Sequence, residues 1–248
     1  MTVSRVLLVA AAGLVLTTLA ARMDGSPSTP GMAAWAANEV EKRPEVKKPV
    51  YLPPLRGAPT RRIGGATRGI GDEGIFVTVL APESTGLTSR ESPTLYWYVS
   101  RAPTRQVEFA LIRDDWIEPV AEVTLGRPAA GGIAGVSLSE LGVRLEPGVL
   151  YEWSIALVKN PLSRSTDIVT SATLLLRAPD GGLKARLERA DAEDRFALYG
   201  RAGYWYDAIE LASSAASGGA ASAKWRAWRA SFLDQVGLQR VAAFDRSP

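Results

Sequence analysis

Residues 145–153 read Leu-Glu-Pro-Gly-Val-Leu-Tyr-Glu-Trp. The Pro-Gly pair is a turn signal, because proline presets one backbone angle and glycine tolerates the left-handed conformation. Beyond the turn, Tyr151, Trp153, Ile155 and Leu157 alternate with polar or small residues. Such alternation is the pattern of a strand with one buried face. The stretch therefore predicts a turn that leads into a half-buried strand.

Outward from this stretch, short β-branched or aromatic runs recur with turn signals between them. They predict seven strands, at residues 75–80, 94–99, 107–111, 117–125, 133–138, 151–157 and 168–177. Short strands at this spacing are typical of two packed antiparallel sheets. We therefore expect a mainly β protein, with an antiparallel β-sandwich domain over residues 61–178.

The leucine, the Pro-Gly turn and the Tyr-x-Trp pair resemble the start of the F strand in immunoglobulin-like and fibronectin-type domains. In those domains a tyrosine hydroxyl bonds to the backbone a few residues upstream. The resemblance assigns that role to Tyr151 and implies an immunoglobulin/fibronectin-like sandwich. It says nothing about function.

After residue 182 the apolar period changes from two to about 3.6 residues, and strong helix formers dominate. The pattern predicts helices at residues 183–200, 204–217 and 221–236, within a helical segment over 183–244. The first two form a hairpin whose spacing resembles a single tetratricopeptide-like repeat, at Tyr199, Gly203, Trp205, Ala208 and Ala215. Because one repeat cannot bury its own faces, the hairpin should pack on the sandwich or on another chain.

Large aromatic residues gather on the helices. Trp225, Trp228 and Phe232 share one face of the third helix by spacing, and Trp205 begins the second. Two interpretations stay open for Trp205, Trp225 and Trp228. They form the seam between helices and sandwich, or they form a face that binds a partner.

The N-terminal segment predicts export. Arg5 precedes the uncharged run Val6–Ala21, which ends in small residues and is short for a bilayer span. We expect residues 1–21 to be a signal peptide, with an uncleaved anchor as the alternative. Residues 22–60 are rich in proline, so we expect a semi-rigid tether. The protein would then be periplasmic or associated with the cell envelope, and would meet the membrane only through this N-terminal signal or anchor.

Composition excludes much familiar chemistry. The chain has no histidine and no cysteine, so Ser-His triads, thiol nucleophiles and His or Cys zinc sites are absent. Its net charge of +3 is not clustered in the way that nucleic-acid binding needs. We expect no cofactor, no metal, no catalytic residue and no nucleic-acid partner.

One basic, glycine-rich motif has chemical character: residues 61–69, Arg-Arg-Ile-Gly-Gly-Ala-Thr-Arg-Gly. Glycines allow close approach, and arginines bind carboxylate or phosphate through a planar fork. The motif predicts a site for an anion or an acidic partner. Its candidate residues are Arg61, Arg62, Gly64, Gly65 and Arg68. The alternative is a glycine-rich turn whose arginines pair with nearby acidic residues.

An acidic cluster surrounds Trp116 and is formed by Asp114, Asp115 and Glu118. A carboxylate pair beside an aromatic ring is the arrangement of a glycosidase, and clustered carboxylates also suit calcium. The alternative is a solvated hairpin turn, because Asp-Asp between strands is ordinary turn chemistry.

Several of these motifs together resemble a bacterial family of unknown function, the domain-of-unknown-function family nine-two-eight. The resemblance rests on residues 61–69, 93–99, 147–153 and 203–208, and it covers about residues 53–244. The family's arginine-glycine motif has three consecutive glycines, whereas Ala66 holds the third place here. The resemblance implies export and a sandwich-like domain, and it brings no catalytic residues.

The sequence therefore favours a non-enzymatic interaction module of the cell envelope that binds an envelope protein or an anionic polymer. One alternative is a hydrolase that acts on envelope carbohydrate with Asp114, Asp115 or Glu118. Another is a structural spacer.

Overall fold

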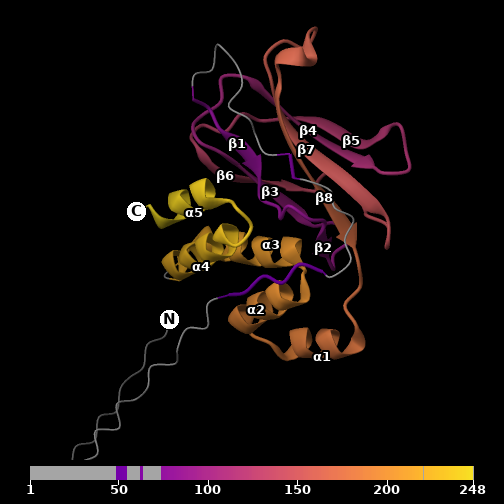
Figure 1. The fold of residues 1–248 in the computed structure, drawn as a ribbon, viewed down its shortest axis with the longest axis vertical. Helices are drawn as coiled ribbons and strands as arrows, with labels where there is room; N and C mark the ends of the chain where they lie inside the picture. The colour runs from indigo at the N-terminus through magenta and orange to yellow at the C-terminus, as the bar shows by residue number, and fades with distance from the viewer. Residues whose placement is uncertain (1–48, 55–61, 64–73, 220, 248) are drawn as a thin grey trace, which may run out of the picture. The chain divides into compact units, whose positions relative to one another are not determined.

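The chain folds as two β-sheets with helices gathered at one end (Figure 1). The computed structural model describes residues 49–54, 62–63, 74–219 and 221–247. Within these residues, the elements are β1 (Val77–Val79), β2 (Gly86–Thr88), β3 (Thr94–Val99), β4 (Gln106–Arg113), β5 (Pro119–Leu125), β6 (Gly132–Ser137), β7 (Leu150–Val158), the 3-10 turn η1 (Arg164–Thr166) and β8 (Ile168–Leu176), followed by α1 (Gly181–Arg189), α2 (Ala192–Ala202), α3 (Trp205–Ala216), α4 (Ser222–Asp234) and α5 (Gln239–Arg246).

The strands form a three-stranded sheet of order β1-β3-β6 and a five-stranded sheet of order β2-β8-β7-β4-β5. Apolar side chains at alternate positions of β4 and β7 are buried, as a strand with one core-facing side requires. Trp97, Phe109 and Trp153 are among the largest fully buried side chains. The expected order of a two-sheet β region followed by C-terminal helices is confirmed, although the α-helices hold about as many residues as the strands.

The expectation of wholly antiparallel sheets is wrong at one strand. β2 was not expected from the sequence, and it pairs in parallel with β8, from Gly86 opposite Leu174 to Thr88 opposite Leu176. Three residues, one of them glycine, give too short a pattern to predict a strand. Outside the strands, Ile63 forms an antiparallel bridge to Ser171 of β8, and Pro147 forms a parallel bridge to Leu176.

The sandwich has the predicted tyrosine contact at the start of β7. The Tyr151 hydroxyl accepts a hydrogen bond from the backbone N–H of Glu146 at 3.1 Å. Tyr151 itself is buried. The role given to this tyrosine is confirmed, and the contact closes the turn that precedes β7.

The helical segment is larger than expected. The predicted helix at 183–200 is two helices, because Asp191 caps α2 by accepting a hydrogen bond from the backbone N–H of Asp194 at 2.8 Å. A further helix, α5, follows α4. Buried Arg229 and Asp245 hold these two together, with Nε–Oδ2 and Nη2–Oδ1 distances of 2.7 and 2.6 Å.

Helix α3 joins the helices to both sheets. Trp205 donates its indole N–H to the carbonyl of Leu80 beside β1, at 2.8 Å. The Tyr206 hydroxyl accepts from the Trp153 indole at 2.9 Å and donates to the Thr173 carbonyl at 3.0 Å. Sheets and helices accordingly lie within one compact unit. The change at 178–183 is one of secondary structure within that unit.

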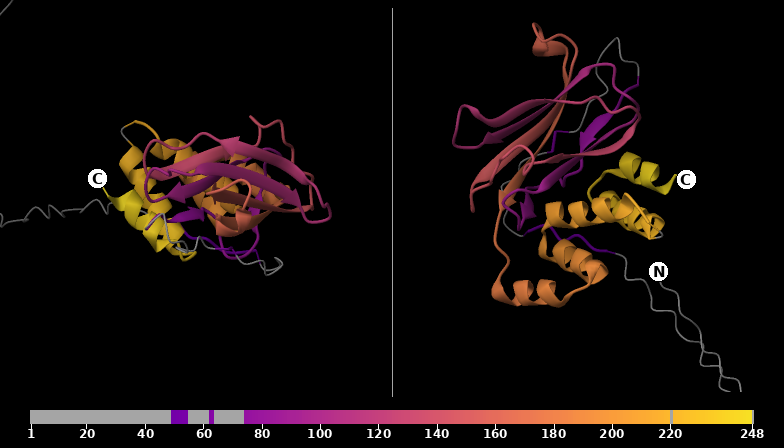
Figure 2. Two further views of the ribbon diagram at one scale, coloured as in Figure 1. Left: turned by 90° about the horizontal axis from the view of Figure 1, so that it is seen from above. Right: turned by 180° about the vertical axis from the view of Figure 1, so that it is seen from behind.

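Residues 49–54, which we call the strap, lie along the helices, as two views agree (Figures 1 and 2). The Tyr51 backbone N–H donates to Gln235 Oε1 at 2.9 Å, and the Leu52 N–H donates to the Gly200 carbonyl at 3.1 Å. The Tyr51 ring is buried edge-on against Trp205 and Phe232, with centroids 4.9 and 5.6 Å away. The predicted tether at 22–60 is therefore wrong for the strap. Proline-rich composition indicates extended backbone, and extended backbone can also dock.

Gly203, the glycine of the predicted repeat-like hairpin, lies in the turn between α2 and α3. Gly203 ends α2 with a φ of 82°, a left-handed value that glycine adopts readily. The strap approaches both glycines: an added Cβ would lie 2.7 Å from the Val50 carbonyl oxygen at Gly200 and 3.2 Å from the Leu52 carbonyl oxygen at Gly203. Gly203 therefore acts in the turn, and the likeness to a tetratricopeptide-like repeat is not confirmed.

Candidate functional site

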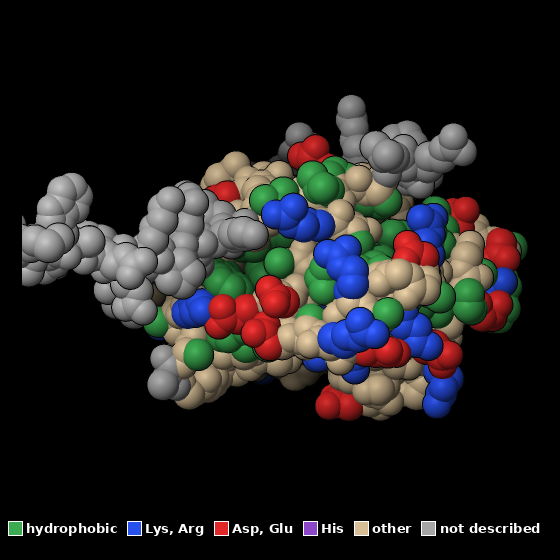
Figure 3. All heavy atoms as spheres, turned by 90° about the horizontal axis from the view of Figure 1, so that it is seen from below, with side chains coloured by type: hydrophobic (Ala, Val, Ile, Leu, Met, Phe, Trp, Pro, Cys, Tyr) green, Lys and Arg blue, Asp and Glu red, His purple; other side chains and the backbone are tan. Residues whose placement is uncertain are grey.

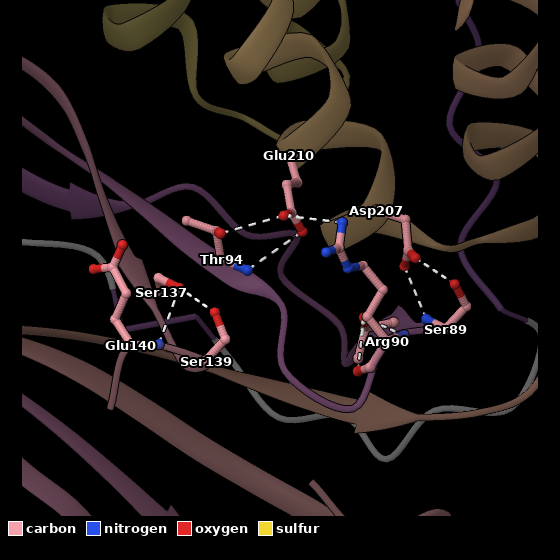
Figure 4. Close-up of polar contacts among 9 residues, drawn as sticks. Ser89, Arg90, Thr94, Ser137, Ser139, Glu140, Asp207 and Glu210 are labelled. Carbon is pink, nitrogen blue, oxygen red and sulfur yellow. Dashed lines mark hydrogen bonds and ion pairs between the residues drawn. The ribbon is translucent and has the colours of Figure 1, made fainter. Parts of the chain in front are cut away.

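Two regions of the described chain carry the polar chemistry. One lies where α3 meets the loop between β2 and β3, and the other is the turn between β4 and β5. We call the first the α3 clamp, formed by Ser89, Arg90, Thr94, Asp207 and Glu210 (Figure 4). We call the second the hairpin tip, residues 112–118.

Asp207 is the most deeply buried carboxylate of the clamp, with 3% of its surface exposed. It lies in the first turn of α3. Its Oδ2 accepts the Ser89 backbone N–H at 2.9 Å, and its Oδ1 accepts the Ser89 hydroxyl. Burial raises the pKa of the Asp207 carboxyl to about 6, although the two Ser89 hydrogen bonds act to lower it.

Glu210 lies one turn further along α3 and binds the start of β3. Its Oε2 accepts the Thr94 backbone N–H at 3.3 Å, and its Oε1 accepts the Thr94 hydroxyl at 3.2 Å. Arg90 Nη1 lies 3.1 Å from the same Oε1. The two carboxylates thus fasten α3 to consecutive parts of the β2–β3 connection (Figure 4).

The chemistry of the clamp is that of attachment. A serine nucleophile needs a base that can carry its proton onward, and the chain has no histidine. The Ser89 hydroxyl gives its hydrogen to a carboxylate that is itself nearly inaccessible to solvent. A second polar group in the same view, Ser137 with Ser139, closes the turn after β6, where the Glu140 N–H reaches Ser137 Oγ at 3.4 Å.

Sequence reasoning missed the clamp. The available signal was Asp207 itself, which stands between the aromatic run Tyr204-Trp205-Tyr206 and the apolar pair Ala208-Ile209. A carboxylate at a buried position needs hydrogen-bond partners, because an unpaired buried charge is costly. Its partner Ser89 is 118 residues away in sequence, and no local pattern indicates that pairing.

The hairpin tip contains the acidic cluster predicted from the sequence. Arg113 Nε donates to Asp115 Oδ1 at 2.5 Å and its Nη2 to Oδ2 at 3.1 Å, while its Nη1 donates to Glu146 Oε1 at 2.6 Å. Hydrogen bonding to Arg113 lowers the pKa of the Asp115 carboxyl. Asp115 therefore stays ionised at neutral pH, where a general acid would have to be protonated. Asp114 and Glu118 are exposed on the same turn.

Apolar side chains are also exposed at the tip. Ile117 is 101% exposed, Trp116 55% and Ile112 41%. The Arg113 guanidinium lies 5.0 Å from the centroid of the Trp116 ring. Because Asp115 and Glu146 hold that guanidinium in place, it offers the Trp116 indole a fixed surface to pack on. The tip is thus an ordered turn that presents apolar surface to solvent.

The arginine-glycine motif lies mostly outside the described residues, as Arg61, Gly64, Gly65 and Arg68 do. Arg62 is described, and its Nη1 donates to the Ala81 carbonyl at 2.7 Å and to the Val236 carbonyl at 3.0 Å. Burial lowers the pKa of its guanidinium, and nearby Glu83 acts in the opposite direction. Arg62 therefore links the chain after β1 to the end of α4.

The three tryptophans proposed for a partner-binding face are not alike. Trp205 and Trp225 are buried, whereas Trp228 is partly exposed. Phe196 packs against both Trp225 and Trp228, with centroids 5.8 and 5.9 Å away. Trp205 lies between the helices and the sheets, and Trp225 packs against Phe196 of α2, so neither buried side chain is available to bind a partner.

The face seen in Figure 3 carries Lys or Arg and Asp or Glu side chains interspersed, so it has no extended field of one sign. At the right-hand end of this view, acidic, basic and hydrophobic side chains lie side by side. Among the described residues, no group of three or more His, Cys, Asp or Glu is placed to hold a metal ion. In that same part of the chain, no helix has the length and apolarity to cross a membrane.

These features define a two-sheet β protein whose C-terminal helices are fastened to both sheets. A family model matches residues 63–245, and the chain belongs to that family, the Domain of Unknown Function (DUF928). The strap lies before the matched region.

No curated protein matches the chain. Among solved structures, it is similar to Astrotactin-2, a conserved vertebrate-specific and perforin-like membrane protein involved in neuronal development. The sequences are 12% identical and the TM-score is 0.27, over 69% of this chain and 35% of the other. The chain thus spans about a third of the length of that protein. A likeness at this TM-score carries no argument here about fold or function.

Proposed function

We propose that this protein is a non-enzymatic interaction module of the cell envelope that binds a protein partner through the hairpin tip. The observation that carries the proposal is the exposed pair Trp116 and Ile117 on a turn braced by Arg113. Tryptophan is enriched at the energetic centres of interfaces. A braced side chain also loses less conformational freedom on binding. In the carbohydrate-hydrolase alternative, Asp115 could act as the base or nucleophile but not as the acid, because Arg113 holds its carboxyl ionised.

Export is part of this proposal and is supported by Arg5 and the apolar run Val6–Ala21. Mass spectrometry of the protein recovered from the envelope tests it. A mature N-terminus near residue 22 is expected. Recovery of the protein in the cytoplasm with its N-terminus intact would contradict export.

We further propose that the sandwich is immunoglobulin-like. The strands β1-β3-β6 would correspond to A, B and E, and the strands β8-β7-β4-β5 to G, F, C and C′. The Tyr151 contact at the start of β7 supports this correspondence. Comparison with an experimental structure of the protein tests it: superposition of these strands on an immunoglobulin domain in another order would contradict it.

Site-specific photo-crosslinking in the cells that produce the protein tests the function. A benzoylphenylalanine replaces Ile117 in one variant of the full chain. In a matched control it replaces Leu162, which is 96% exposed on the connection between β7 and β8. A discrete protein adduct at position 117 and none at position 162 is expected. Equal labelling of both positions, or no adduct at position 117, would overturn the proposal.

A further inference from the structure

We infer that the partner of the hairpin tip is a protein surface that presents lysine or arginine side chains around an apolar contact. This inference rests on the proposed function and names the chemistry of the partner. It joins two properties of the hairpin, its exposed apolar side chains and its local charge.

The apolar contact is compact. Three of the large hydrophobic side chains that are exposed on the described surface, Ile112, Trp116 and Ile117, lie within six positions of one turn. Ile112 is on the strand itself, where it pairs with Pro119 of β5 and Glu152 of β7. The apolar surface thus begins on the outer side of the sheet and continues onto the turn. Clustered apolar exposure of this kind marks an interaction surface, whereas scattered single residues do not.

The charge of the hairpin opposes that of the chain. Residues 114–126 contain no lysine or arginine, and their acidic residues are Asp114, Asp115, Glu118 and Glu122, while the whole chain carries +3. Arg113 is paired with both Asp115 and Glu146. Asp114, Glu118 and Glu122 are exposed on the same hairpin as the apolar side chains. The hairpin is therefore a negative region on a basic protein, and it complements a cationic surface.

The same charges argue against a lipid partner. Tryptophan and isoleucine at a turn could enter a bilayer interface, but anionic headgroups repel carboxylates. A protein interface instead places opposite charges at its rim, where they steer association and select the partner. The exposed apolar side chains of the hairpin, with exposed carboxylates beside them in the sequence, fit that design.

The test adds charge reversal to the crosslinking assay at position 117. One variant carries Asp114→Lys with Glu118→Lys. The matched control carries Glu140→Lys with Glu188→Lys, two exposed carboxylates outside the hairpin, so net charge changes equally. Circular dichroism and thermal melting establish that both variants fold. The crosslinked peptide of the partner is then sequenced by mass spectrometry.

The expected result has two parts. Adduct yield falls about tenfold with the hairpin reversal and is retained in the control, because attraction becomes repulsion. The partner peptide contains lysine or arginine within a few residues of the crosslinked position. An unchanged yield, a partner peptide without basic residues, a lipid adduct or an adduct to a second copy of this chain would each overturn the inference. A protein adduct that ignores charge reversal leaves the proposed function standing, whereas no adduct removes both.

Discussion

At the scale of single residues, Tyr206 has the most consequential polar atom in the core. Its hydroxyl bonds Trp153 of β7 and Thr173 of β8 at once. The ring is fully buried, and an added Cβ on Gly86 would lie 2.7 Å from its Cε2. One oxygen atom therefore links α3 to both strands.

Tyr206→Phe should lower the free energy of unfolding by about 2 kcal/mol, because it leaves a buried N–H and a buried carbonyl without their partner. Urea denaturation monitored by circular dichroism measures the loss. Tyr98→Phe removes a hydroxyl from another largely buried tyrosine and serves as the control. A loss no larger than in the control would show that the bridge contributes little.

Asp207 gives the fold a dependence on pH. Its pKa rises from 3.8 to about 6 in the folded protein, so between these values the folded state holds a proton that the unfolded state has released. The stability contributed by this group is therefore complete below about pH 4 and is lost as the pH rises through 6. Three neighbouring residues also affect this pKa: hydrogen bonds from Ser89 and Thr88 lower it, and the charge of Glu210 raises it.

Asp207→Asn should remove this dependence. The difference in unfolding free energy between wild type and variant should change by up to about 3 kcal/mol from pH 4 to pH 7, at about 1.4 kcal/mol per pKa unit. Chemical denaturation at several pH values measures it. Glu193→Gln, at an exposed carboxylate paired with Lys224, is the control. Identical pH profiles for wild type and the Asp207 variant would contradict the assignment.

At the scale of elements, the strap behaves as part of the helical layer. It contributes one aromatic ring to a cluster that otherwise comes from α2, α3 and α4. Gln235, at the end of α4, accepts from the Tyr51 N–H and donates to the Pro49 carbonyl at 2.9 Å. Burial raises the pKa of the Tyr51 hydroxyl. A chain trimmed to the family match at residue 63 would lose all of these contacts.

Tyr51→Ala should destabilise the protein by about 3 kcal/mol, the range for removal of a large buried aromatic side chain. Leu52→Ala, at the exposed neighbour, should change stability by less than about 0.5 kcal/mol. Thermal or urea unfolding of both variants measures the contrast. Equal effects would mean that the strap does not anchor through its tyrosine.

Elements with long, regular patterns could be predicted from the sequence, and those with short or composite signals could not. Alternation over residues 151–157 anticipated β7 because that strand pairs on both sides and buries one face. β2 has three residues and takes its partner from 88 positions further along the chain. The prediction for the strap was wrong for another reason. Its proline-rich composition indicates an extended chain, but the burial of the single side chain of Tyr51 docks that chain on the helices.

At the scale of the whole molecule, sandwich and helices should unfold together. Trp205 bonds to the chain after β1, Tyr206 to β7 and β8, and Glu210 to β3, so removal of the helices would strip polar partners and apolar cover from both sheets. We expect one calorimetric transition for residues 46–248, with equal calorimetric and van't Hoff enthalpies. A chain that ends at residue 180 should fail to give a cooperative transition. Two separate transitions would contradict this coupling.

The candidate site was predictable in part. The acidic turn was visible in the sequence, as Asp114, Asp115, Glu118 and their neighbour Trp116. The order of this turn could not be predicted, because it depends on an ion pair between Arg113 and Glu146, which is 33 residues away. The tryptophans of the helices were equally visible, but sequence spacing alone cannot say whether a helix face meets the protein's own sheets or solvent. Burial decides that question for Trp205 and Trp225.

The docked strap sets an order of events during synthesis. Tyr51 leaves the ribosome early, and Gln235, which receives its N–H, follows 184 residues later. At about 5–20 residues per second, that interval lasts roughly 10 to 40 seconds. During this interval Tyr51 and its proline neighbours lack the helix residues that bury them. The strap can therefore be covered only after α4 has been made, so this part of the fold cannot be completed before residue 235 has been synthesised.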